Sequence, residues 1–141
     1  MNGVWGVLAV FTVAMLLIAG AVFRLNDESL LVPPPESVAE GFTRALVAGR
    51  YDRALPYLSE ELAAEEGPEG MLGLAYLLRL RTGKVLNVQG EPGWMTNERA
   101  DAAAVIETAS GDYVRLTFPM SRRQGVWSIS SLHRIEQETG R

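Results

Sequence analysis

The sequence predicts an α+β protein in which an N-terminal transmembrane helix precedes helices packed on a curved antiparallel sheet of about four strands. Three observations support this fold class. The first 23 residues of the 141 carry no charged side chain. Apolar residues between positions 38 and 80 recur at helical spacing, and from position 84 onward they alternate with polar ones. Helices that precede a run of strands, instead of alternating with them, are typical of the α+β class.

The N-terminal segment Val4–Phe23 contains no charged residue. At about 1.5 Å per residue, a helix of this length spans about 30 Å, the thickness of a bilayer core. We therefore expect residues 1–24 to form a single-pass anchor that contacts membrane lipid through residues 4–23. A signal peptide cleaved near Ala19-Gly20-Ala21 is an alternative, although no Lys or Arg precedes the apolar run. A buried core helix is a second alternative.

The charges beside this segment say little about its orientation. Arg24 is the basic side chain closest to the predicted membrane, and Asp27 and Glu28 follow it on the same side. The excess of Lys and Arg that marks cytoplasmic loops is therefore nearly absent. Because small domains on one short anchor commonly lie outside the cytoplasm, we expect a bacterial-type cell membrane with the domain on its extracytoplasmic side.

Residues 25–35 are expected to form a linker, which Pro33-Pro34-Pro35 stiffens. Pro35 suits a first helical turn, and Glu36 complements the positive end of the helix dipole. Met71–Leu80 is apolar almost all round, which predicts a helix buried between layers. The spacing predicts helices from Pro35 to Gly49, from Tyr51 to Leu58, from Ser59 to Ala64 and from Met71 to Leu80, with a break at Gly67, Pro68 and Gly70.

Alternation of apolar and polar residues predicts the strands. Turns are expected at Ser110-Gly111-Asp112 and at Arg123-Gln124-Gly125, and a loop or irregular edge at Glu91–Glu98. The domain is thus predicted to cover residues 36–136, with a frayed polar tail at 137–141. The four predicted strands are Lys84–Gln89, Arg99–Ala109, Tyr113–Met120 and Val126–Glu136.

The composition limits the classes of partner. The chain has 17 acidic and 13 basic side chains and a formal charge of −4. Nucleic acid is therefore not expected as a partner, because phosphate binding needs a clustered basic surface. The chain contains no cysteine. This excludes disulfides, thiolate metal sites, cysteine nucleophiles and a lipid-modified cysteine.

The order of these elements resembles the nuclear transport factor 2-like superfamily, a cone-like α+β fold shared with SnoaL-like and ketosteroid isomerase-like proteins. The resemblance covers about residues 35–136. It rests on the opening "ALVAGRYDRALPYLSEEL", the strands "RADAAAVIET" and "DYVRLTFPMSR", and the closing "QGVWSISSLHRIE". The resemblance implies a fold more than a function, since members include enzymes, binding domains and subunits of assemblies. Anchored members with a similar layout include inner-membrane scaffold components.

The residues show no convincing catalytic constellation, so we expect no enzyme, no cofactor and no metal site. His133 is the single histidine, and it alternates onto the same face as Trp127. A histidine on that face could act as a general base if Glu107 or Asp101 oriented it. The alternative is a strand-end histidine bonded to water or backbone. No ketosteroid isomerase-like catalytic position can be mapped onto this chain.

Four residues are candidates for a pocket or an interaction surface. Trp94 lies in a Pro-Gly loop and either covers the open end of the cone or anchors a ligand or partner. Tyr113 and Trp127 belong to predicted strands, where core or rim positions are the simpler explanation. His133 completes the set.

The sequence therefore favours a non-catalytic, membrane-anchored domain that acts as an accessory or scaffold subunit of a membrane protein assembly. Membrane proteins are the expected partners. One alternative is the binding of a small apolar ligand in the cone pocket, which requires a void among the inward side chains. Another is a cyclase- or isomerase-type enzyme, which requires His133 or a carboxylate inside a cavity.

Overall fold

A computed structural model describes residues 32–132 and 137–140. The chain divides into two compact units, Met1–Val32 and Pro33–Arg141, and the second is described below. The predicted anchor at residues 4–23 lies outside the described residues. In the part that is described, no helix combines the length and apolar character needed to cross a membrane.

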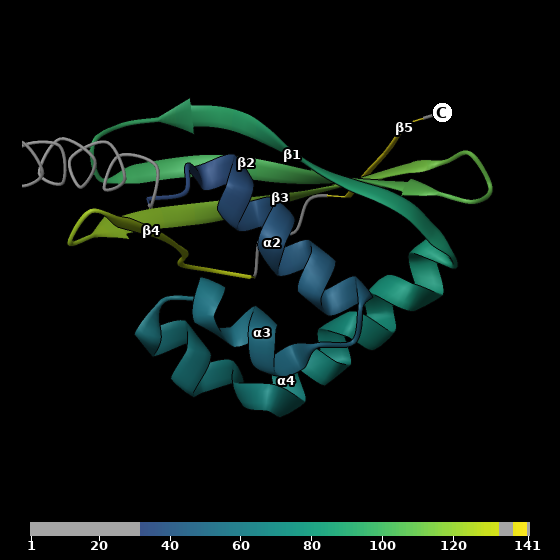
Figure 1. Cartoon of the computed structure of the whole chain (residues 1–141), viewed down its shortest axis with the longest axis horizontal. Coiled ribbons are helices and arrows are strands. Elements are labelled where there is room, and N and C mark those ends of the chain that lie inside the picture. The colour runs from purple at the N-terminus through teal and green to yellow at the C-terminus, as the bar shows by residue number, and fades with distance from the viewer. Residues whose placement is uncertain (1–31, 133–136, 141) are drawn as a thin grey trace, which may run out of the picture. The chain divides into compact units, whose positions relative to one another are not determined.

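The domain begins with helices and continues with strands, as the sequence predicts (Figure 1). The helices are α2 (Pro35–Val47), α3 (Tyr51–Ala54), the 3-10 helix η1 (Leu55–Tyr57) and α4 (Glu60–Thr82). The strands are β1 (Val85–Met95), β2 (Arg99–Thr108), β3 (Tyr113–Arg123), β4 (Val126–Ile129) and β5 (Gln137–Gly140).

Local sequence signals set the ends of α2. Pro35 is its first residue and Glu36 lies in its first turn, where a carboxylate is favourable near the helix dipole. Gly49 follows the helix at a φ of 70°, a conformation that costs glycine little. Its N–H donates to the carbonyl of Leu46, and that of Arg50 donates to Ala45. These bonds satisfy carbonyls that the helix end leaves free.

Ser59 caps α4, since its hydroxyl accepts a hydrogen bond from the Leu62 N–H at 3.3 Å. The helix is then interrupted at Gly67, whose backbone has a φ of 63° and a ψ of −175°. Pro68 restarts it, because a proline at a first helical position lacks only an N–H that would have no helical partner. The predicted break at these residues is confirmed as a kink inside one long helix.

The strands form an antiparallel sheet in the order β1-β2-β3-β4, with β5 also paired to β3. The β3–β4 hairpin closes through Gln124 and Gly125, at φ angles of 51° and 78°, as in a type I′ turn, which matches the twist of the strands. Residues 100, 102, 104 and 106 of β2 and 114, 116, 118 and 120 of β3 are buried and face the helices.

Helix α2 packs directly on the sheet, and α4 contacts α2, α3 and η1 on the far side (Figure 1). The close approach of α2 depends on Gly90 of β1. An added Cβ at Gly90 would lie 2.1 Å from the carbonyl oxygen of Glu36. The Arg44 guanidinium also donates to the carbonyl of Val88 at 2.8 Å. The helix-facing side of the sheet is therefore covered by α2.

The expectation that Met71–Leu80 is buried between layers is wrong. Met71, Ala75 and Leu78 are buried, but Leu72, Tyr76, Leu77 and Leu80 are exposed. The physical reason is that α2 already covers the sheet, so α4 forms an outer layer with one buried face.

Of the two alternatives predicted for Glu91–Glu98, the loop is wrong over most of its length, because β1 continues to Met95, and the irregular edge is confirmed. The chain tolerates Pro92 there because β1 lies at the edge of the described sheet, where a missing N–H breaks no second ladder. A register shift between Pro92 and Met95 accommodates one extra residue of β1.

The last predicted strand, Val126–Glu136, is divided. β4 ends at Ile129, which pairs with Met120. The N–H of the next residue, Ser130, donates to the carbonyl of Pro119, but Pro119 has no N–H to donate in return. β5 then pairs Gln137 with Leu116, whereas the β4 register would have placed residue 133 there, four residues earlier. The expectation of a frayed tail at 137–141 is corrected in the same way, since Gln137–Gly140 pairs with β3.

Candidate functional site

The space between α2 and the sheet is filled by side chains. Phe42 of α2 meets Phe118 of β3 edge to face, with ring centroids 5.4 Å apart and an interplanar angle of 83°. Both rings are fully buried, as are Met71, Met120 and Ile129. A crevice of about 30 Å³ between α2 and α4 has room for about one water molecule. The helix-facing side of the sheet is thus a packed core.

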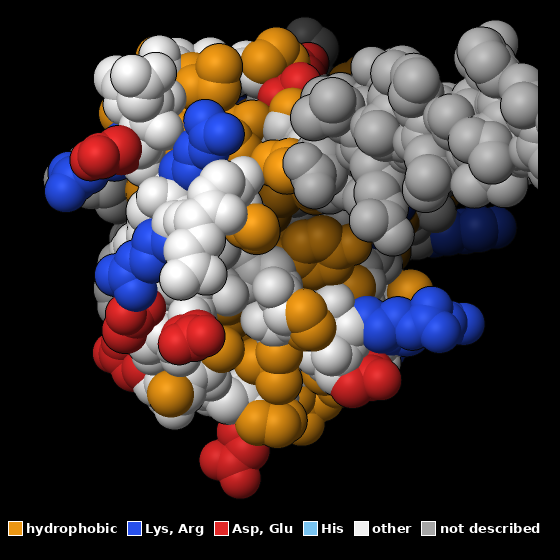
Figure 2. Space-filling model, turned by 60° about the vertical axis from the view of Figure 1, so that its left-hand side comes forward, with side chains coloured by type: hydrophobic (Ala, Val, Ile, Leu, Met, Phe, Trp, Pro, Cys, Tyr) orange, Lys and Arg blue, Asp and Glu red, His pale blue; other side chains and the backbone are white. Residues whose placement is uncertain are grey.

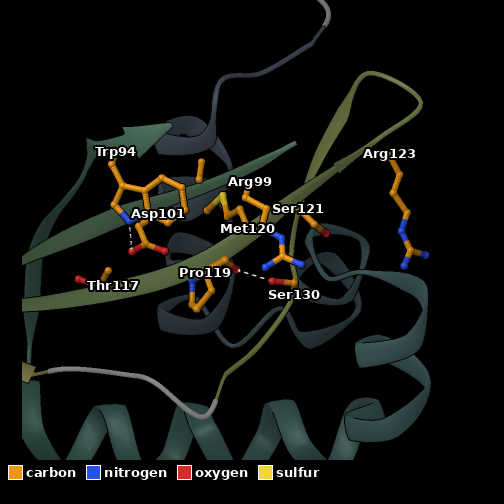
Figure 3. A pocket seen from close by; sticks show the side chains of 10 residues that line it. Trp94, Arg99, Asp101, Thr117, Pro119, Met120, Ser121, Arg123 and Ser130 are labelled. Carbon is orange, nitrogen blue, oxygen red and sulfur yellow. Dashed lines mark hydrogen bonds between the residues drawn. The ribbon is translucent and has the colours of Figure 1, made fainter. Parts of the chain in front are cut away.

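A larger depression, of about 630 Å³, lies on the opposite face of the sheet (Figure 3). We call it the outer depression. The strand alternation explains its polarity, because residues 117, 119, 121 and 123 of β3 point away from the core that Phe118 and Met120 enter. Its lining residues are Trp94, Arg99, Ala100, Asp101, Thr117, Pro119, Met120, Ser121, Arg123 and Ser130.

Two of the charged groups in the outer depression already have partners. The Trp94 indole N–H donates to the Asp101 carboxylate at 2.6 Å, as Figure 3 shows. The Arg123 guanidinium pairs with Glu61 at the start of α4. This hydrogen bond lowers the pKa of Glu61 and raises that of Arg123. Arg99 makes no ion pair with residues 32–132, so its guanidinium is the cation open to a ligand there.

The three sequence candidates that lie among the described residues are far apart in the fold. Trp94 is on the outer face, 55% exposed, and Tyr113 is exposed at the start of β3. Trp127 is buried in the core, with the Arg122 guanidinium 5.9 Å from its ring centroid. His133 lies outside the described residues. Asp101 and Glu107, considered as orienting carboxylates, both stand on the outer face of β2.

A second surface was missed by the sequence interpretation. Along the C-terminal half of α4, the exposed fractions of Leu72, Tyr76, Leu77 and Leu80 are 53%, 62%, 59% and 67%. Gly73 lies among them, exposed, with nothing within 4 Å of the position of an added Cβ. We call these five residues the α4 apolar face. The face in Figure 2 also carries hydrophobic side chains in its middle, with charged side chains around them.

The signal for this face was present in the sequence. At 100° per residue, positions 72, 73, 76, 77 and 80 fall on the side of the helix opposite positions 71, 75, 78 and 82. A helix with two apolar sides either buries both of them within its own domain or exposes one of them, which can then contact another molecule. Periodicity cannot distinguish these cases, because it does not reveal that α2 occupies the sheet.

No family model and no curated protein matches the sequence. The structure is similar to a crystal structure of a Campylobacter jejuni protein described as an NTF2-like transpeptidase. The match has a TM-score of 0.57 and 16% sequence identity, and covers 71% of this chain and all of the other. The fold is NTF2-like. The resemblance stated from the sequence is confirmed to that extent, and identity this low carries no activity from one protein to the other.

Proposed function

We propose that this protein is a non-catalytic accessory or scaffold subunit of a membrane protein assembly, anchored by residues 4–23. The observation that carries the proposal is the α4 apolar face. Its four large side chains are each more than half exposed and lie on two successive turns of one helix. Contiguous apolar surface of this kind marks interaction sites, whereas singly scattered apolar residues do not.

The filled core supports the same proposal. Fully buried aromatic and aliphatic side chains occupy the place where the sequence analysis required a void for a small apolar ligand. The α4 apolar face, in contrast, is not covered by any other part of the described domain. A helix presenting anchors at i, i+4 and i+8 suits packing against another helix.

The test is native mass spectrometry of the full-length protein, extracted gently from its own membrane. We expect a reproducible complex for the wild type and its loss in Leu77→Glu, because the variant places a charge in the centre of the α4 apolar face. Met95→Glu is the matched control, since Met95 is 64% exposed on β1 and should leave the complex unchanged. A wild type that is always alone, or a complex that Leu77→Glu leaves intact, would contradict the proposal.

The outer depression favours a second candidate function, the binding of a polar small molecule. Its size is within the range of ligand sites, and it combines an aromatic ring, an open guanidinium on Arg99 and hydroxyl groups. The same mass spectra would detect a retained small molecule on the wild type. Arg99→Ala should release it, whereas Arg79→Ala, which removes a guanidinium from α4 outside the depression, should retain it. A wild type without adduct would oppose this candidate.

A further inference from the structure

The α4 apolar face is complementary in charge to a second copy of itself. Glu69 lies one turn before Leu72 and Gly73, on the same side of the helix. The opposite end carries the basic residues Arg79, Arg81 and Lys84. A parallel neighbour would bring like charges together at both ends, whereas an antiparallel neighbour brings the acidic end of each helix to the basic end of the other.

We propose that two copies of this chain associate through α4 in an antiparallel, two-fold symmetric pair. This proposal rests on the proposed function, because it names the partner that the α4 apolar face would bind. A two-fold interface is isologous, so the patch must fit itself. If the axis passes between Tyr76 and Leu77, residue i meets the partner's residue 153 − i. Tyr76 then faces the partner's Leu77 across the axis, so the two copies of each residue lie only one position apart along the helix.

Shape complementarity follows from the same register. Leu80 faces the partner's Gly73, and Gly73 faces the partner's Leu80. Nothing lies within 4 Å of the Cβ position of Gly73, so this position is open to the leucine. Small residues opposite large ones allow helix axes to approach to about 8–10 Å. Glu69 comes toward the basic C-terminal end of the partner's α4, so the charges are complementary at both ends of the pair.

The area of this contact indicates a weak pair in solution. With about 200 Å² for each large side chain, the four that are 53–67% exposed offer on the order of 500 Å² per copy. The total of about 1,000 Å² is the lower limit for a specific interface. Confinement of two anchored copies to one membrane raises their effective concentration. The pair should therefore be more stable in the membrane than after extraction into detergent.

The absence of cysteine from the chain permits a decisive test by disulfide cross-linking in the native membrane. Full-length Leu77→Cys should form a disulfide-linked homodimer with itself, because position 77 adjoins the axis. Gly73→Cys alone should not, since its two copies lie seven residues apart along the helix, about 10.5 Å, beyond the Cα separation that a disulfide allows. Gly73→Cys mixed with Leu80→Cys should cross-link.

The pattern of cross-links distinguishes failure of the two-fold pair from failure of the proposed function. Self-linking of Gly73→Cys, or failure of the mixed pair when Leu77→Cys does link, would overturn the antiparallel register. Linkage of Leu77→Cys to native cysteines of other proteins, without homodimer, would overturn the pair and leave the accessory-subunit proposal standing. No cross-link at any position, with a complex insensitive to Leu77→Glu, would overturn both. Val126→Cys, exposed on the β3–β4 hairpin, is the control for random collision and should not link.

Discussion

Replacing Gly90 by alanine tests how α2 is seated on the sheet. The added methyl carbon would lie 2.1 Å from the carbonyl oxygen and 2.8 Å from the carbonyl carbon of Glu36, and 3.2 Å from the Cβ of Glu40. The first two atoms belong to the backbone of α2, so no side-chain rotation relieves the overlap. The helix must move by about 1 Å to restore ordinary contact distances.

That movement affects the whole α2–sheet interface. A gap of about 0.5–1 Å forfeits a quarter to a half of the dispersion energy of the contacts it opens, and the Phe42–Phe118 contact is among them. Overpacking of this kind typically costs about 1–3 kcal/mol. For a domain of this size, the melting temperature should fall by about 4–8 °C for each kcal/mol, so we expect a decrease of about 5–20 °C.

The measurement is thermal unfolding of the full-length chain in detergent, followed by circular dichroism. Gly73→Ala is the matched control, because its methyl group meets nothing within 4 Å and alanine gains up to about 1 kcal/mol over glycine in a helix. The control should melt at the wild-type temperature or above it. A Gly90→Ala protein that melts within about 1 °C of the wild type would refute the close seating of α2.

Three further outcomes are expected. Phe118→Ala should cost about 3–5 kcal/mol, since its ring is fully buried against Phe42; a loss below about 1 kcal/mol in urea unfolding would contradict this packing. Thr43→Val should be neutral or stabilising by up to about 1–2 kcal/mol, because the buried Thr43 hydroxyl has no hydrogen-bond partner among the described residues; a clear loss of stability would indicate a partner. Glu61→Gln removes a carboxylate whose pKa Arg123 holds below its ordinary value. In the wild type, the Glu61–Arg123 pair stabilises the fold above the pKa that Glu61 has in the unfolded state, and this contribution is lost as the pH falls through its pKa in the folded state. The variant should therefore lose slightly less stability than the wild type between roughly pH 5 and pH 3. Identical pH profiles would show that the exposed pair contributes nothing.

The sequence predicts this fold well where the signal is local. The hairpin turns at Gly111 and Gly125 are confirmed, both at positive φ, because only a few residue types suit that conformation. The cap at Ser59 and the short 3-10 turn at Pro56 follow from equally local chemistry. Such features depend on a few consecutive residues, which a sequence displays directly.

The incorrect predictions concern features that depend on residues distant in the chain. Whether the apolar side of α4 at Leu77 is buried depends on α2, which ends 30 positions earlier in the chain. Whether the last strand continues past Ile129 depends on Pro119 of the facing strand. The candidate surfaces were the least predictable part of the structure. Trp94 and Asp101 meet only because β1 and β2 pair, and the periodicity of a sequence does not show which strands pair.

The edge strand β1 has a consequence for how copies of this chain can meet. An exposed strand offers unpaired N–H and C=O groups to any neighbouring strand, and this is a common route to aggregation. β1 interrupts that row with Pro92, which has no N–H, and with two register shifts along its length. Glu91 adds a charge there, paired with Arg115 across the sheet. Crowded together, these domains are thus less able to extend their sheets through β1, and contact across this edge is left to side chains.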